Sequence, residues 1–164
     1  MDAEIVVFDG FEDLDAFGPL NALAIAGYDV ALVAVGEPRP TLSGHGTVVV
    51  PTRRMSEAPD IVVVPGGGWL DRAEKGAWAE AQRGDLPDAL AKASSAGSLL
   101  TSVCTGAFLI AATGLLRGRP AVTNAAAFDE LEATGVHVVR DARVVDDGDI
   151  VTSGGLTAGL DLAL

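Results

Sequence analysis

The chain has 164 residues, enough to bury a sizeable core, and we predict one domain over residues 1–164. Hydrophobic residues make up 49% and charged residues 21%, which excludes a disordered protein, and no apolar run is long enough to cross a membrane. Lys and Arg number 11 against 23 acidic residues, so nucleic acid is not an expected partner, because its phosphates would be repelled.

The first third of the chain alternates apolar runs with turn residues. Residues 4–8 predict a buried strand, and residues 9–13 form the turn after it. A helix is expected over Asp15–Ala26, because apolar residues recur on one face and a glycine follows. Residues 28–35 predict a second strand. Residues 47–51 predict a third, placed at a sheet edge by its terminal proline.

The clearest buried strand covers residues 60–64 and runs into a proline and three glycines. Glycines after a buried strand let the backbone approach a ligand and can present N–H groups to it. We therefore place Gly66, Gly67 and Gly68 beside a possible pocket, with an ordinary turn as the alternative. Trp69 follows them and either covers that pocket or packs in the core.

The only cysteine lies between a predicted strand and a predicted helix. A helix over residues 85–96 precedes the strand, and the helix after Cys104 is expected to end at residue 114. Ser102 lies two residues before the cysteine and Gly106 two residues after it. Small residues at those positions are typical of a nucleophile elbow, the sharp turn that exposes a reactive side chain.

A helix that begins at Cys104 directs unpaired amides at the sulfur, and we expect this to favour the thiolate over the thiol. The alternative is an inert cysteine buried in the core. A single cysteine also excludes an internal disulfide and a thiolate-rich zinc site. Together with an N-terminus that lacks a secretion signal, it predicts a cytoplasmic protein.

Further short elements complete the chain. They are strands at 121–123, 136–139, 143–145 and 150–153, a helix over 125–133, and a last helix opened by residues 154–159. Strands that alternate with helices predict an α/β fold, with a mostly parallel sheet sandwiched by helices. The acidic loop before the first helix, the glycines and Cys104 all follow strands, so they should meet at the carboxyl ends of the sheet.

Asp15 is the expected partner of Cys104. Its place at the start of the first helix also suits a plain N-cap, and Asp13 is a second candidate in the same loop. A carboxyl beside a thiolate should resist ionisation and could act as an acid. His45 and His137 have no companion at metal-ligand spacing, so we predict that they are structural or surface residues, with no metal and no cofactor.

Four ordered motifs resemble the ThiJ/PfpI superfamily over the whole chain. They are Asp15-Ala16-Phe17-Gly18-Pro19, Val63-Val64-Pro65-Gly66-Gly67, Ser102-Val103-Cys104-Thr105-Gly106, and the segment 154–161. The resemblance implies a flavodoxin-like arrangement of the class I glutamine-amidotransferase type. Within the superfamily these motifs are most similar to isocyanide hydratases and to the ligand domains of AraC-type regulators.

The resemblance implies that Cys104 is a nucleophile and Asp15 its acidic partner, with Gly67 and Thr105 as backbone donors facing the sulfur. It also implies a small-molecule substrate and a homodimer. In such a hydratase, the sulfur attacks an isocyanide carbon to give a thioimidate, which water converts to an N-substituted formamide. A lyase or hydrolase is therefore the leading hypothesis.

Two departures from the resemblance matter. Relatives often carry a histidine where this chain has Asn124, a possible pocket residue, and this disfavours a protease, amidase or glyoxalase that needs a Cys-His pair. The chain also stops inside its last predicted helix, so we expect that helix to be incomplete. A non-catalytic redox sensor with an oxidisable cysteine and a small-molecule binding module remain the alternatives.

Overall fold

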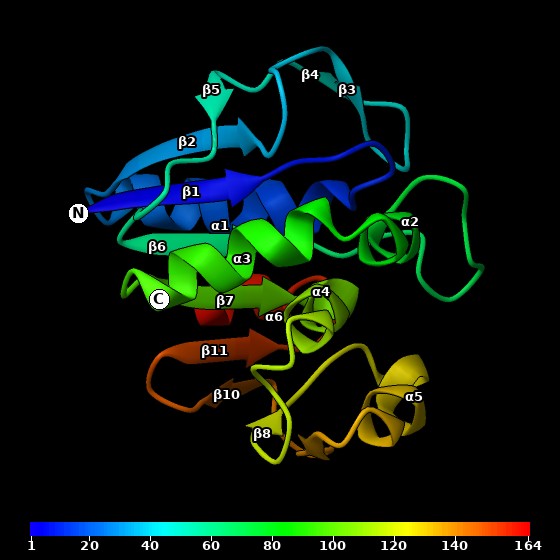
Figure 1. Cartoon of the computed structure of the whole chain (residues 1–164). Coiled ribbons are helices and arrows are strands. Elements are labelled where there is room, and N and C mark those ends of the chain that lie inside the picture. The colour runs from blue at the N-terminus through cyan, green and yellow to red at the C-terminus, as the bar shows by residue number, and fades with distance from the viewer.

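A seven-stranded sheet forms the centre of the computed structural model, which describes residues 1–164 (Figure 1). Its strands are β10 (Val144–Asp146), β11 (Ile150–Ser153), β7 (Leu99–Val103), β6 (Ile61–Val64), β1 (Asp2–Val6), β2 (Asp29–Ala34) and β5 (Arg53–Arg54), in that spatial order. Every neighbouring pair is parallel except β10 and β11. The predicted α/β fold with a mostly parallel sheet is thereby confirmed.

Helices cover both faces of the sheet. They are α1 (Asp13–Ile25), α2 (Ala77–Arg83), α3 (Asp85–Ser95), α4 (Ala107–Ala112), α5 (Phe128–Ala133) and α6 (Ala158–Leu162), with two 3₁₀ turns, η1 (Cys104–Gly106) and η2 (Ala125–Ala127). In Figure 1, α3 lies in front of the sheet, while α1 and α6 lie behind it. None of the helices combines the length and apolar content that a membrane crossing requires.

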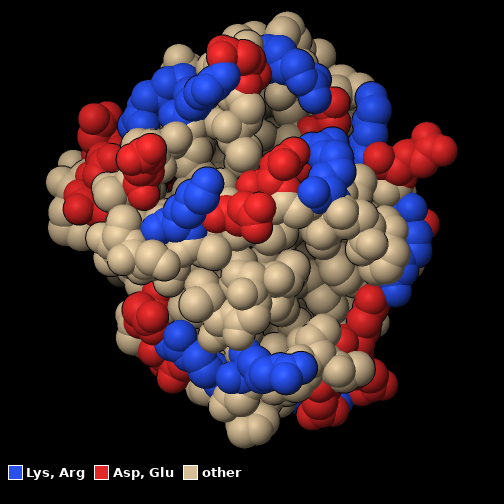
Figure 2. Space-filling view, in the orientation of Figure 1, with Lys and Arg blue, Asp and Glu red and all other residues tan.

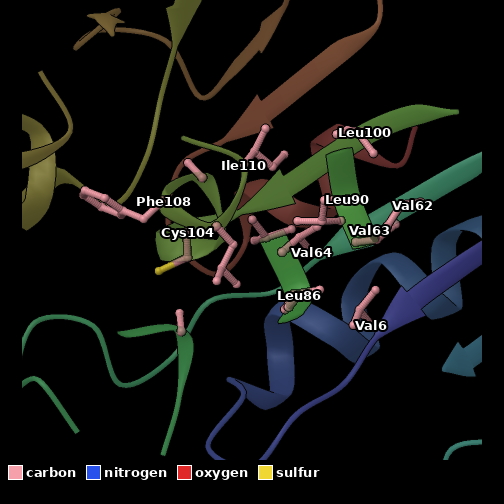
Figure 3. Packing of buried hydrophobic residues seen from close by; sticks show 14 of the residues in the cluster. Val6, Val62, Val63, Val64, Leu86, Leu90, Leu100, Cys104, Phe108 and Ile110 are labelled. Atoms are coloured by element: carbon pink, nitrogen blue, oxygen red, sulfur yellow. The ribbon is translucent and has the colours of Figure 1, made fainter. Parts of the chain in front are cut away.

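The core lies where α3 packs on the middle strands. Val62, Val63 and Val64 of β6 are fully buried, because helices cover both sides of the strand. Leu86 and Leu90 of α3 are spaced one helical turn apart, and Figure 3 shows both directed at these valines. Each buried side chain of this size contributes about 1.5–3 kcal/mol relative to exposure.

The edge of the main sheet differs from our prediction. The strand expected over 47–51 is reduced to β4 (Val48–Val49), which pairs antiparallel with β3 (Thr41–Leu42) in a separate hairpin. Val48 is 62% exposed, so this apolar run has no sheet face to cover. The edge position belongs instead to β5, whose two arginines carry no strand signal.

Smaller differences concern lengths and pairings. The short strands expected near 121–123 and 136–139 appear as β8 (Pro120–Ala121) and β9 (His137–Val138), which pair with each other outside the main sheet. Helix α2 was not predicted, because its sequence is short and weakly patterned. Helix α1 begins two residues earlier than expected, and α4 ends at Ala112, two residues short of residue 114.

The topology defines one crevice at the carboxyl edge. The sheet extends from β1 through β2 in one direction and through β6 in the other, so the loops after β1 and β6 diverge from a common point. Ligands of open α/β sheets gather at such a switch point. The loop before α1, the glycines after β6 and the cysteine after β7 are the segments that border it.

Candidate active site

Cys104 lies at a strained turn immediately after β7. Its φ angle is +56°, a left-handed conformation that costs about 1–2 kcal/mol for a residue other than glycine. The backbone around it is fixed on both sides: its N–H donates to the Gly154 carbonyl at 2.9 Å, and its carbonyl accepts from the Thr123 hydroxyl at 2.8 Å. A Cβ at Gly106 would lie 2.1 Å from the Val64 carbonyl oxygen, so this flank must be glycine. The turn has the backbone geometry expected of a nucleophile elbow.

The Cys104 sulfur is directed away from the labelled valines and leucines of the core (Figure 3). The residue is 8% exposed, so the sulfur is nearly dry but borders a pocket. The side-chain amide of Asn124 donates a hydrogen bond to the sulfur over 3.4 Å, and the same side chain accepts from the Ala126 N–H at 3.0 Å. The second bond fixes the orientation of the first.

Asp15 is completely buried in the first turn of α1. One carboxyl oxygen, Oδ2, accepts from the Gly66 N–H at 3.1 Å. The carboxyl and the Cys104 side chain are close enough for each to affect the pKa of the other. The other oxygen, Oδ1, is buried without a partner of ordinary hydrogen-bond geometry. Glu12, not Asp15, occupies the N-cap position of α1, so the capping interpretation of Asp15 is wrong.

The environment of Asp15 favours its neutral form. Burial raises the pKa of the carboxyl to about 7, the N–H of Gly66 opposes this, and the charge of Glu12 reinforces it. The direction agrees with our prediction. The main cause is the loss of water, however, and not the neighbouring sulfur.

The prediction that the following helix favours a thiolate is wrong. Burial and then the charge of Asp15 raise the pKa of the Cys104 thiol to about 11, against hydrogen bonds from Asn124 and Thr105 that lower it. The helix after the elbow opens with a 3₁₀ turn and continues for only six residues, so its dipole is small. Between about pH 7 and about pH 11, Asp15 and Cys104 therefore hold one proton between them.

The glycines after β6 organise this pair from one side. The N–H of Gly67 donates to the Thr105 hydroxyl at 3.1 Å. It therefore does not face the sulfur, and what the resemblance implied for Gly67 is wrong. The Thr105 backbone N–H is placed to lower the pKa of the Cys104 thiol. A Cβ at Gly66 would lie 2.5 Å from the Thr105 hydroxyl oxygen, which explains the need for glycine.

A pocket of about 290 Å³ opens in front of the sulfur. Its lining consists of Glu12, Gly67, Gly68, Trp69, Leu70, Asp71, Cys104, Thr105, Asn124 and Leu156. Trp69 serves both roles considered for it, because it lines the pocket and also stacks on Phe108 with ring centroids 4.0 Å apart. The pocket is large enough for a small organic molecule next to the sulfur.

Sequence reasoning missed several of these residues. Glu12 lies in the acidic loop expected at the site and Leu156 in the fourth motif, but neither was singled out as a pocket residue. Leu70 and Asp71 line the pocket and belong to no motif. His45 reaches the site's edge, where its Nε2 atom lies 3.1 Å from both Glu12 carboxylate oxygens. Glu12, Asp13 and His45 offer atoms within 4.8 Å of one another, so they are the residues that could hold a metal ion. His137 is exposed on β9 and does not line the pocket.

Fold and site together define an α/β protein with a cysteine at a strand-to-helix elbow and a buried acid beside it. The DJ-1/PfpI family profile matches residues 1–164, and the chain belongs to the DJ-1/PfpI family. This confirms the ThiJ/PfpI resemblance carried by the four motifs.

Three relatives illustrate the range of the family. Isonitrile hydratase of Pseudomonas putida is 36% identical over 162 residues, covering 97% of this chain and 67% of the relative. A deglycase of Thermococcus kodakarensis is 28% identical over 153 residues, covering 91% of this chain and 87% of the relative. The crystal structure of a ThiJ/PfpI family protein from Pseudomonas syringae matches with a TM-score of 0.84 and 27% identity, over 99% of this chain and 65% of that one.

Proposed function

We propose that this protein hydrates small isocyanides to N-substituted formamides, with Cys104 as nucleophile and Asp15 as proton donor. The observation that carries the proposal is that the buried Asp15 carboxyl and the Cys104 thiol affect each other's pKa, and that Cys104 lines a pocket. The 36% identity to the isonitrile hydratase of Pseudomonas putida supports the same reaction.

The chemistry needs one nucleophile and one mobile proton. The sulfur of Cys104 forms a bond to the terminal isocyanide carbon, and the proton shared with Asp15 moves to the same carbon, giving a thioimidate. Water then adds to that carbon. One proton of the water goes to the substrate nitrogen and the other returns to the Asp15–Cys104 pair as the carbon–sulfur bond breaks. The product is a formamide, and the enzyme regains its initial state.

Other enzyme chemistries of the family fit this site less well. A protease, amidase or glyoxalase that depends on a Cys-His pair needs an imidazole near the sulfur. Asn124 occupies that neighbourhood, and no histidine lines the pocket. An amide donates a hydrogen bond but cannot accept a proton, so proton transfer at the sulfur falls to Asp15.

The test is formamide release from a panel of alkyl and aryl isocyanides, followed by mass spectrometry. We expect turnover by the native chain, no turnover by Cys104→Ala, and a rate about 10²–10⁴-fold lower for Asp15→Asn. Asp29→Asn is the matched control, because Asp29 is exposed at the start of β2, at the other end of the sheet. Failure of every isocyanide with the native chain would overturn the proposal.

A redox-sensing role is the second candidate, because a neutral Asp15 carboxyl could donate a hydrogen bond to an oxidised Cys104. The raised pKa of the thiol makes oxidation slow. A sensor would gain two oxygen atoms at Cys104 with near-stoichiometric peroxide, as seen in the intact mass, and would turn over no isocyanide.

We further propose that the chain forms a homodimer. Leu14 of α1 and Leu160 of α6 are each 39% exposed and flank Gly18 together, so they form an apolar surface over two helices. Sedimentation velocity should give a dimeric mass that Leu14→Glu converts to a monomeric one. A monomer for the native chain at micromolar concentration would contradict the proposal.

A further inference from the structure

The pocket in front of Cys104 has an unbalanced set of charges. Glu12 and Asp71 line it, and Lys, Arg and His are all missing from its ten lining residues. The rest of its wall is glycine, apolar side chains and neutral polar groups. A molecule that approaches the sulfur therefore passes two carboxylates and no cation.

This arrangement differs from the face of the molecule that α3 covers. Figure 2 shows acidic and basic side chains next to one another on that face. Several are joined in ion pairs, such as Arg83 with Glu80 at 2.6 Å. A ligand there would meet both signs of charge, whereas the pocket at Cys104 presents one sign only.

Three basic groups border the pocket without lining it. His45 and Lys75 line an adjoining cavity, which shares Glu12 and Asp71 with the pocket. Arg72 forms an ion pair with Glu130 at 2.7 Å and lies over the Trp78 ring. It also donates to the carbonyl of the pocket-lining Trp69 at 2.8 Å, so its charge lies behind the pocket wall and is offset by Glu130. Positive charge thus stays outside the space in front of the sulfur.

The negative charge of Glu12 affects groups in the site that its side chain does not touch. Its side chain is 23% exposed and is held in place by His45. Its negative charge also contributes to the raised pKa of the buried Asp15 carboxyl. Its field therefore reaches the place where a substrate would react, in surroundings that screen it less than bulk water does.

We propose that Glu12 and Asp71 make this pocket selective for charge, so that it accepts neutral and cationic substrates and rejects anionic ones. The inference deepens the proposed hydratase function. It assigns as substrates isocyanides with an apolar or ammonium-bearing body, and it excludes those that carry a carboxylate or a phosphate.

The test uses Cys104 itself as the reporter, since it is the only cysteine of the chain. Two alkyl methanethiosulfonates of similar size, one with a trimethylammonium group and one with a sulfonate, form a disulfide with the sulfur and release methanesulfinate, while the thiol proton goes to the buffer. Each rate is divided by the rate with a free small thiol. The ratio of cationic to anionic labelling then cancels any change in the pKa of the thiol.

We expect the native chain to favour the cationic reagent. Glu12→Gln and Asp71→Asn should each lower the ratio about fourfold, because one neutralised carboxylate changes the two rates by about twofold in opposite directions. The control Asp29→Asn removes the same charge from the chain at the first residue of β2, at the edge of the sheet opposite the pocket. It should leave the ratio within about twofold of the native value. The proposal is overturned if both pocket variants behave like this control, or if the native chain favours the sulfonate.

A second measurement separates this inference from the proposed function. The native chain is assayed with neutral, ammonium-bearing and carboxylate-bearing isocyanides of matched length, and we expect the carboxylate to raise KM most. If no isocyanide is turned over while the labelling ratio responds to Glu12 and Asp71, the hydratase function fails and charge selection stands. If isocyanides are turned over with equal KM, charge selection fails and the hydratase function stands.

Discussion

Replacing Asp15 with asparagine should stabilise the fold in neutral and alkaline solution while it removes activity. Burial raises the pKa of this carboxyl from 3.8 to about 7, so the folded chain binds a proton that the unfolded chain has already released. Its contribution to stability is complete below about pH 3.8 and is lost as the pH rises through about 7. Between about pH 5 and about pH 8.5 the native chain should lose about 3 kcal/mol relative to Asp15→Asn.

Urea unfolding of the two chains at both pH values measures this difference. An asparagine can still accept the Gly66 N–H through its side-chain oxygen, so the substitution retains the hydrogen bond at 3.1 Å while it removes the charge. Asp29→Asn, at an exposed position, should show no such dependence on pH. If the stability difference between Asp15→Asn and the native chain is the same at both pH values, the carboxyl does not titrate near neutrality and the argument fails.

Three further substitutions test other parts of the structure. Asn124→Asp can still accept its backbone N–H but loses the amide donor to the sulfur, so the pKa of Cys104 should rise and alkylation by iodoacetamide at about pH 8 should slow about tenfold. Gly106→Ala places a methyl group against a carbonyl of β6 and should destabilise the fold by about 3 kcal/mol, whereas Gly36→Ala, with open space around it, should be nearly neutral in the same urea titration. Glu4→Ala removes the buried carboxylate that pairs with Arg53 and accepts two hydrogen bonds from Ser56, so the free energy of unfolding from urea titration should fall by about 2 kcal/mol.

Much of the fold could be predicted because its strands are continuous apolar runs. Residues 60–64 and 99–103 have no alternative to burial between two helical layers, and both became central strands. The elbow was predictable for a similar reason. Its small neighbours at Ser102 and Gly106 make sense only where the backbone bends sharply, and Cys104 does adopt a positive φ.

The errors lie where tertiary contacts outweigh local pattern. Val48 and Val49 have strong strand preferences, but their neighbours in space are a two-residue hairpin partner and solvent. The two arginines of β5 form the edge strand of the sheet instead. The buried carboxylate of Glu4 holds this strand in place, because it pairs with Arg53 and accepts hydrogen bonds from Ser56. No local feature of the arginine pair signals this long-range contact.

In the site, too, the sequence indicated which residues take part, whereas their surroundings depend on tertiary contacts. Residue types and spacing indicated Cys104 and Asp15, and the family resemblance indicated the position of Asn124. The structure brings these three to one place. The direction of the thiol pKa could not be predicted, because it depends on how much water the fold removes. Leu70 and Asp71 belong to the pocket only through the packing of their loop, for which the sequence offers no signal.

The burial of Asp15 is better explained by reactivity than by folding. A carboxyl at this position costs stability above about pH 7, and an asparagine could accept the same hydrogen bond without that cost. What an amide cannot supply is a proton that moves at neutral pH. A buried acid with a pKa of about 7, next to a sulfur that keeps its own proton until about pH 11, provides one. The destabilising carboxyl and the strained cysteine affect each other's pKa, as expected where stability is given up for catalysis.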